Sequence, residues 1–277
     1  MEFVKGTGGL VYLAAVLASA FVIELLAPWR KGVKIDMARW LRNASMAAYG
    51  TILLSLIPFI AAYGAAVSAE TNGIGALNQF GAPLWAKLII SVAVLDLMAY
   101  GQHRALHKWY IFWRAHRAHH TDEHIDLTTS LRFHPFETLF RAIIELGVVL
   151  TIGIPPEGIL LSYMVQVFAN TISHTNATLP LAVDKIVSRV FTTPQIHRLH
   201  HSTNVDHQFT NFGTVFTLWD QLFGTYLSPE HLHDDERFGV DGPEGDQPDT
   251  FATLALDPFR KPKQAAIPQP ATTHSSV

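Results

Sequence analysis

Histidine is the most unevenly distributed residue type in this chain. All fifteen histidines lie at or after position 103, and fourteen of them fall between His103 and His233. Many sit in three short segments, HRALH, HRAHH and HRLHH. Neutral imidazole is a good ligand for zinc, copper, iron and nickel. The distribution therefore points to metal chemistry in this part of the chain.

The spacing within these segments is helical. Residues three or four apart lie on one face of a helix, so each segment presents a pair of imidazoles to a common point. One lone HxxxH would be weak evidence, and the prediction depends on three clusters occurring together. The candidate ligands are His103, His107, His116, His119, His120, His174, His197, His200 and His201. Nine donors exceed the four to six positions around one ion, so the sequence predicts a site for two metal ions.

Polar residues close to these clusters are candidates for orienting the imidazoles. Asp96 lies two helical turns before the first histidine and is a candidate acceptor for the far nitrogen of a ligating imidazole. Asn176 and Asn211 are candidates for the same role, and Asn176 is alternatively a turn-capping residue. Arg132 and Glu137, which flank HPF, are expected to form an ion pair that positions a loop. Three histidines outside the paired spacing are weaker candidates for metal or supporting positions: His124, His134 and His207.

Apolar segments precede and separate the histidine clusters. The composition is 49% hydrophobic and 16% charged, with a mean hydropathy of +0.20, which is apolar for a soluble protein. Residues 9–29, 45–69 and 84–100 are each about long enough to cross roughly 30 Å of hydrocarbon. Residues 138–172, interrupted by two prolines, predict a helical hairpin. We therefore expect an all-α integral membrane bundle of about four spans, with a cleaved signal peptide as the alternative reading of the first segment.

Basic residues indicate the orientation of this bundle. The loop after the first span contains Arg30, Lys31, Lys34, Arg39 and Arg42, whereas residues 70–83 contain no basic residue. Loops rich in Lys and Arg stay on the cytoplasmic side. The histidine clusters should then emerge in the cytosol as a cap on a multi-pass protein. The short chain and a C-terminal THSSV without a dilysine pattern favour a bacterial inner membrane.

Composition also excludes several functions. The absence of cysteine excludes disulfides, thiolate zinc sites and a cysteine nucleophile. A net charge of −3 gives no sign of the clustered basic surface that binding of nucleic acid needs.

The composition changes near the C-terminal end of the chain. Residues 241–277 are rich in Pro, Ala, Ser and Thr and are predicted to form a flexible tail. Residues 1–240 are predicted to form one membrane domain.

Residues 96–226 resemble the fatty acid hydroxylase and sterol desaturase superfamily of membrane non-haem di-iron oxygenases. The matching segments, in the family's order and spacing, are DLMAYGQHRALH, FWRAHRAHH, RFHPFE, SHTN, TPQIHRLHHS and NFGTVFTLWDQLFGTY. The resemblance implies a four-helix scaffold with a cytosolic di-iron cap held by the nine histidines, with His134 as a supporting position. Gln102 and His207 depart from the family pattern and put substrate selection in doubt. No fused cytochrome segment is visible, so the resemblance implies a separate electron donor, of the cytochrome b5, ferredoxin or reductase type.

These observations favour hydroxylation of a C–H bond in a lipid, either fatty acyl or sterol-like, with two irons, O2 and two electrons. A lipid desaturase with the same site is an alternative, because the outcome depends on where the reacting carbon sits. A membrane metal carrier without oxygen chemistry is an alternative of another class, and it would place ligands near the bilayer midplane. A third alternative is a structural zinc site. Histidines outside the spans and the absence of cysteine favour the oxygenase.

Overall fold

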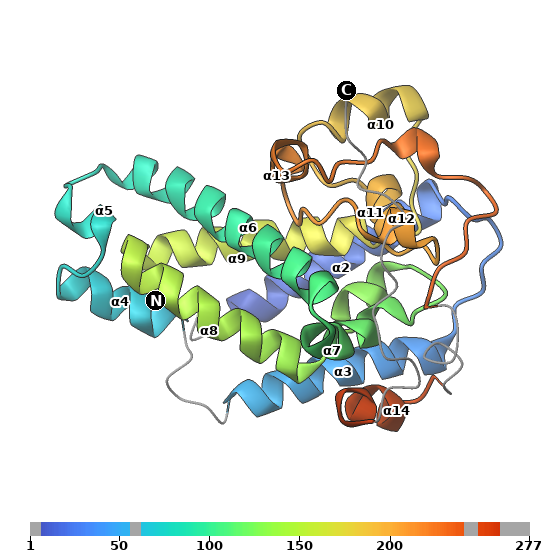
Figure 1. Ribbon diagram of the computed structural model, residues 1–277, viewed down its shortest axis with the longest axis horizontal. Coiled ribbons are helices and arrows are strands. Elements are labelled where there is room, and N and C mark those ends of the chain that lie inside the picture. Colours follow the sequence, from blue (N-terminus) through green and yellow to red (C-terminus); the bar gives the residue numbers. More distant parts are fainter. Residues whose placement is uncertain (1–6, 56–61, 241–248, 261–277) are drawn as a thin grey trace.

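The computed structural model describes residues 7–55, 62–240 and 249–260, which form helices joined by loops (Figure 1). Within these ranges there is no β-strand, and only isolated bridges such as Pro28 to Ala177 occur. Long helices lie together at one end of the molecule, and short helices gather at the other. The predicted all-α class is confirmed.

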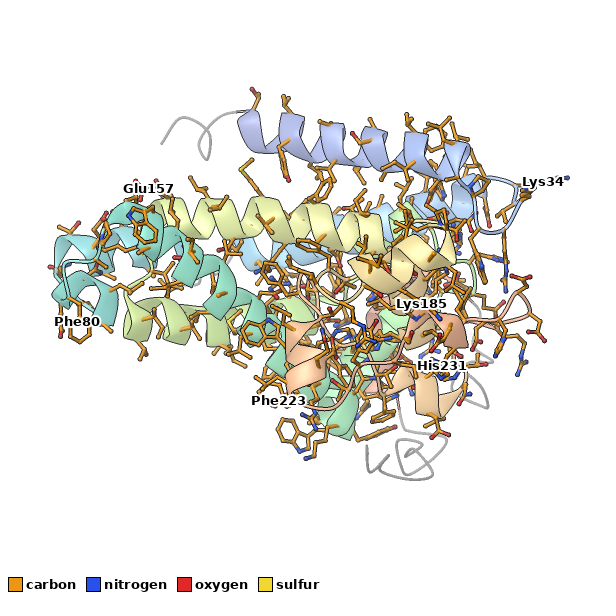
Figure 2. All side chains as sticks on the ribbon, turned by 90° about the horizontal axis from the view of Figure 1, so that it is seen from above. Lys34, Phe80, Glu157, Lys185, Phe223 and His231 are labelled. Carbon is orange, nitrogen blue, oxygen red and sulfur yellow. The ribbon has the colours of Figure 1, made fainter. Side chains whose placement is uncertain are left out.

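The long helices form a bundle. They are α2 (Gly8–Leu26), α3 (Met37–Ser55), α4 (Ala62–Thr71), α6 (Leu84–Lys108), α8 (Pro135–Ile152) and α9 (Pro156–Ser173). Helix α9 contacts α6 and α2, while α8 contacts α3 and α4. Figure 2 shows α2, in blue, running along α9. A buried apolar core lies where α4, α6, α8 and α9 meet, made of Ala62, Ala66, Leu95, Val149, Ile154 and Ile159.

The chain reverses between α8 and α9, as the paired prolines predicted. Gly153 ends α8 with a left-handed φ of 76°, a conformation that favours glycine, and Pro156 begins α9. Gly158 then allows α9 to approach α6 closely, because a Cβ there would lie 2.3 Å from Ser91 Oγ. The hairpin therefore packs against α6 and presents its far end to the histidine region.

Two described helices, α2 and α6, are long and apolar enough to cross a membrane by length and composition. Only Val16 and Ala20 of α2 are buried, so most of its apolar surface is exposed. Residues 45–69, predicted as one span, fall on α3 and α4, with residues 56–61 outside the described ranges. About four spans were predicted, and length and composition identify two of them.

Helix α3 begins earlier than predicted, so Arg39 and Arg42 are helical and do not belong to the expected loop. Arg39 is buried, with its Nη1 2.9 Å from Asp122 Oδ2 and its Nη2 paired with Asp126. It therefore fastens α3 to the segment that follows the second histidine cluster, and it is not a marker of an exposed cytoplasmic loop.

The histidine region is a cap of short elements. They are α7 (Tyr110–His120), η1 (Leu127–Leu131), α10 (Leu181–Val187), α11 (Pro194–His200), α12 (Val205–Gln208), α13 (Leu218–Leu222) and η2 (Pro229–His231). The remaining elements are α5 (Ala76–Gln79), between α4 and α6, and α14 (Phe251–Leu256) with η3 (Asp257–Phe259). Helix α7 contacts both α6 and α8, which joins the cap to the bundle.

Residues 249–260, which belong to the predicted flexible tail, contain α14 and η3. Asp257 is buried and accepts hydrogen bonds from Arg117 Nε and Nη2, both at 2.8 Å. Leu254 of α14 packs against Met46 and Ala118. A buried ion pair and an apolar contact hold this segment, although its composition resembles that of a linker. The rest of the predicted tail, 241–248 and 261–277, lies outside the described residues.

Candidate metal centre

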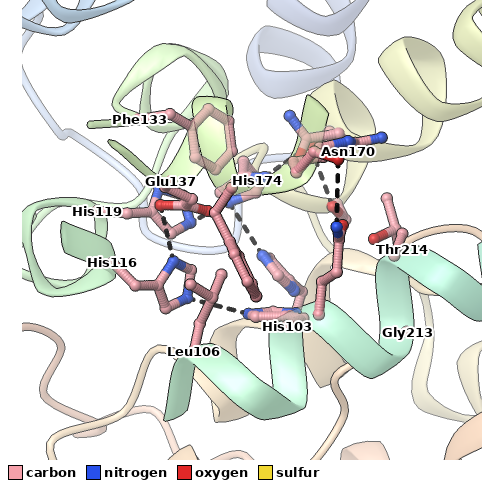
Figure 3. Close-up of a pocket in the computed structure, with 16 residues that line it drawn as sticks. His103, Leu106, His116, His119, Phe133, Glu137, Asn170, His174, Gly213 and Thr214 are labelled. Carbon is pink, nitrogen blue, oxygen red and sulfur yellow. Dashed lines mark hydrogen bonds and ion pairs between the residues drawn. The ribbon is translucent and has the colours of Figure 1, made fainter. Parts of the chain in front are cut away.

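Four separate parts of the chain bring the nine candidate histidines together. His103 and His107 lie in the last turns of α6, and the second cluster lies on α7. His174 follows the last residue of α9, and the third cluster occupies α11 and the residue after it. Figure 3 shows His103, His116, His119 and His174 converging on one cavity.

The nine imidazoles divide into two groups. One contains His103, His107, His116, His120 and His200, and the other contains His119, His174, His197 and His201. Within each group the nearest ring nitrogens all lie within 4.8 Å of one another. The pairs four residues apart stay together, as helical spacing requires, whereas adjacent histidines go to opposite groups.

Backbone carbonyls set the orientation of three rings. The Nδ1 atoms of His103, His174 and His200 lie 2.9, 2.6 and 2.8 Å from the carbonyl oxygens of Phe212, Asn170 and Thr210. A carbonyl only accepts, so each Nδ1 carries the proton and donates it. The lone pair is then on Nε2, the atom directed at the group, which is the usual arrangement of a metal-ligating histidine.

Several ring nitrogens are buried without a hydrogen-bond partner in the described part of the chain. Both nitrogens of His107, His120 and His201 have none. An unpaired buried polar group costs about 1–3 kcal/mol, so six such atoms in one place require an explanation. Metal coordination supplies one, and nine nitrogen donors in groups of five and four fit two ions such as iron or zinc.

Burial also keeps the imidazoles uncharged. It lowers the pKa values of His119, His120, His197 and His201 well below 6.5, and repulsion from neighbouring imidazoles lowers them further. For His200 the same causes lower the pKa to about 3. A neutral imidazole has a free lone pair, so at neutral pH these rings are in the form that binds metal.

Glu137 lies in the site, in a role that the sequence analysis did not assign to it. Its Oε2 lies 3.0 Å from His116 Nδ1, in the arrangement in which a carboxylate orients a metal-binding histidine (Figure 3). The expected ion pair with Arg132 is wrong, because Arg132 Nη2 instead lies 2.7 Å from Asp249 Oδ1. The sequence signals were its place in RFHPFE and in the first turn of a predicted helix, and helix-dipole stabilisation explains the second equally well.

Asp96 does not contact an imidazole, contrary to the sequence hypothesis. Its carboxylate accepts hydrogen bonds from the backbone N–H groups of Val215 and Phe216 at 3.0 and 3.1 Å, and from Trp219 Nε1 at 2.9 Å. It therefore anchors the loop whose Phe212 carbonyl orients His103. Asp96 therefore supports His103 indirectly, because it holds the loop that contacts this histidine.

The two asparagines are also structural. Asn211, with a left-handed φ of 53°, donates to the carbonyls of Ile196 and Leu227, both at 3.0 Å. Asn176 exchanges hydrogen bonds with the backbone of Arg30, at 3.1 and 3.0 Å. Neither forms the expected hydrogen bond to an imidazole, because their short side chains are used to join backbone segments.

The three weaker histidine candidates lie outside both groups. His134 Nδ1 accepts the Phe136 N–H at 3.1 Å and so caps the start of α8. His207 Nδ1 lies 3.2 Å from Glu236 Oε1, and His124 is exposed. His124 is four residues after His120, but α7 ends at His120, so helical spacing does not carry it into the site. None of the three belongs to either histidine group of this structure.

A small cavity of about 70 Å³ lies against both groups. Its lining combines ligand candidates with apolar side chains, among them Leu106, Phe133 and Phe140. Arg141 and Asn170 are further polar residues on its wall. A reacting group of a few atoms therefore has space beside the imidazoles, next to apolar side chains.

Taken together, the fold and the site define a helical protein with a buried pair of histidine-rich metal positions at one end of an apolar bundle. Residues 88–225 match the family model described as fatty acid hydroxylase. Through this region the chain belongs to the fatty acid hydroxylase superfamily, and relatives named as a hydroxylase and a monooxygenase support an oxidoreductase.

Curated relatives agree with this family. The chain is 28% identical over 147 residues to the ornithine lipid hydroxylase of Rhizobium tropici, covering 53% of this chain and 44% of that protein. It is 34% identical over 139 residues to the alkylglycerol monooxygenase of Caenorhabditis elegans, covering 49% and 26%. A very-long-chain aldehyde decarbonylase of Oryza sativa is 29% identical over 163 residues, covering 52% and 24%. The similarity thus spans less than half the length of each relative. No solved structure matches significantly.

Proposed function

We propose that this protein is a membrane-bound oxygenase that hydroxylates a C–H bond of a lipid with two irons, O2 and two electrons. The observation that carries the proposal is the pair of adjoining buried imidazole groups beside a cavity with apolar walls. Imidazole alone suits several metals. Iron is supported by relatives named as a lipid hydroxylase and a monooxygenase.

The residues of this chain have separable tasks in such a reaction. When bound, the two irons would supply oxygen activation and electron transfer. The neutral imidazoles hold the metal positions, and the carbonyls of Phe212, Asn170 and Thr210 fix three of their tautomers. Leu106, Phe133 and Phe140 keep water from the cavity and accept the apolar part of a substrate.

A lipid substrate requires access from a membrane. The exposed side chains of α2 are mostly apolar, with Leu10 71% and Leu26 80% exposed, and α6 carries the first two histidines at its C-terminal end. We propose a multi-pass protein of the bacterial inner membrane with the histidine cap in the cytoplasm. The bacterial source of the ornithine lipid hydroxylase supports this location.

This topology can be tested because the chain has no cysteine. Single cysteines at Glu230, exposed in the cap, and at Asn72, exposed at the opposite end of the bundle, provide a matched pair. In intact spheroplasts a membrane-impermeant maleimide should label Asn72→Cys and spare Glu230→Cys. The reverse labelling would overturn the orientation, and labelling of both would argue against a membrane between them.

The proposed reaction needs two electrons, and we propose that a separate protein supplies them. We expect a separate donor of the cytochrome b5, ferredoxin or reductase type, as the family resemblance implies. Activity reconstituted with purified protein, lipid and a donor system, but absent without the donor, would support this requirement.

The function itself is tested by metal analysis and product analysis on one preparation. Elemental mass spectrometry of detergent-purified protein should find about two irons per chain, with a coupled Mössbauer signature. Lipids treated under ¹⁸O2 should gain one labelled oxygen. Loss of two hydrogens without oxygen gain would identify a desaturase instead. Zinc without iron-dependent activity would contradict the proposal and favour a structural or carrier role.

A further inference from the structure

A second, larger cavity adjoins the small one. It has a volume of about 730 Å³ and is lined mainly by apolar atoms from α3, α4, α8 and α9, including Leu54, Ala142 and Val167. Four residues line both cavities: Phe133, Arg141, Asn170 and Thr214. The larger space has room for an acyl chain, whereas the smaller has room for a few atoms. A lipid that occupies both would lie beside these four residues, of which Arg141 is the charged one.

Arg141 is a charged group on an apolar helix at this junction. Among the described residues it forms no ion pair, and its one side-chain hydrogen bond runs from Nη2 to Gln166 Oε1. Glu145 lies one helical turn farther along α8, and its carboxylate is hydrogen-bonded by Tyr163. Most guanidinium donors of Arg141 are thus unused, although the side chain lines two cavities.

The half-buried Arg141 interacts electrostatically with the carboxyls of Glu145 and Asp96, but neither forms an ion pair with it. Its remaining N–H groups are therefore available to an oxygen group that enters either cavity. Guanidinium presents its N–H groups in a fork that matches the paired oxygens of a carboxylate or a phosphate. The arrangement thus suits an anionic oxygen group at the polar end of a lipid.

Building on the proposed function, we propose that Arg141 binds an anionic oxygen group of the lipid substrate and thereby selects which carbon is oxidised. The acyl chain occupies the larger cavity. Arg141 and His116 line the same cavity of about 70 Å³, so the oxidised carbon lies within a few bonds of the bound polar group. Asn170, which lines both cavities, is placed to contact the same end of the lipid.

Equilibrium binding tests this recognition without turnover. The probes are palmitate, hexadecyl phosphate and hexadecanol, which share a saturated chain and differ in the terminal group. Wild-type protein should bind at least one anionic probe about tenfold more tightly than the alcohol, a difference typical of a charge-assisted hydrogen bond. Preference for one anionic probe alone would identify carboxylate or phosphate as the group recognised.

Two substitutions at Arg141 and one control complete the experiment. Arg141→Met should bind all three probes with similar affinity, while Arg141→Lys should keep part of the preference because it keeps the charge. The control, Arg189→Met, removes an exposed arginine of the cap and should behave as wild type. A purely structural link between Arg141 and Gln166 would change stability and leave the relative affinities unaltered, and that result would overturn the proposal.

The experiments distinguish failure of lipid recognition by Arg141 from failure of the proposed oxygenase function. If wild-type protein discriminates between the probes but oxidises no lipid, the oxygenase proposal fails and recognition by Arg141 stands. If it oxidises lipid far from the polar end, or if Arg141→Met keeps both the product position and the anion preference, recognition fails and the oxygenase stands. Mass spectrometric fragmentation of the product locates the new oxygen.

Discussion

The imidazole rings of His120 and His201 stack with a centroid separation of 4.4 Å and an interplanar angle of 17°, although they belong to different groups. His120 is preceded by His119, a member of the other group, and His201 is preceded by His200 in the same manner. This interleaving places the two candidate metal positions side by side. It also means that each position draws ligands from α7 and from α11.

The group of four should be sensitive to loss of a single ligand. His119→Ala leaves three imidazoles in that group, so bound metal should fall from about two ions to about one per chain. Elemental mass spectrometry of the purified variant measures this directly. His124→Ala, which removes an exposed histidine outside both groups, is the control and should keep the wild-type content. Unchanged metal in the His119 variant would contradict the assignment.

Glu137 should strengthen metal binding through His116. Glu137→Gln removes the negative charge that lies 3.0 Å from His116 Nδ1, and loss of such a partner commonly weakens metal affinity about tenfold to a hundredfold. Competition with a graded chelator measures the change. Glu157→Gln alters an exposed glutamate at the start of α9 and serves as the matched control. Equal affinities for both variants would show that the contact has no role in binding.

Asp96 should matter more for stability than for metal affinity. Asp96→Asn puts an amide N–H opposite at least one of the N–H groups that the carboxylate now accepts. The unsatisfied donor should lower the free energy of unfolding by about 1–3 kcal/mol. Thermal unfolding in detergent tests this, with Asp235→Asn on the exposed surface as the control. A variant with wild-type stability but weakened metal binding would support the earlier sequence hypothesis instead.

Metal-free protein should lose stability in acid. The pKa of His200 is about 3 in the folded chain and about 6.5 in the unfolded chain. The unfolded state therefore binds more protons within this window, so stability is complete above about pH 6.5 and falls as pH decreases towards 3, by about 1.4 kcal/mol per pH unit for this histidine. Denaturant unfolding of chelator-treated protein should show the slope, and His200→Asn should reduce it. A flat profile between about pH 7 and pH 5 would contradict the neutral buried state.

Much of the fold was predictable because apolar runs and prolines act locally. The all-α class, the start of α6 and the reversal between α8 and α9 follow from hydropathy and from proline geometry. The early start of α3 was not predictable from hydropathy, because Arg39 is buried only by pairing with Asp122 and Asp126. The ordered segment at 249–260 depends in the same way on Arg117, a partner distant in sequence.

In the candidate site, too, local features were predictable from the sequence and long-range contacts were not. Helical periodicity alone determined which histidines face a common direction, since residues four apart share a face whatever surrounds them. Only the tertiary structure decided that the clusters combine into groups of five and four, that Glu137 reaches His116, and that Asp96 holds a loop. These features depend on how α6, α7, α8 and α11 pack together. Contacts between segments that are distant in the chain produce no repeating pattern of residue types from which they could be predicted.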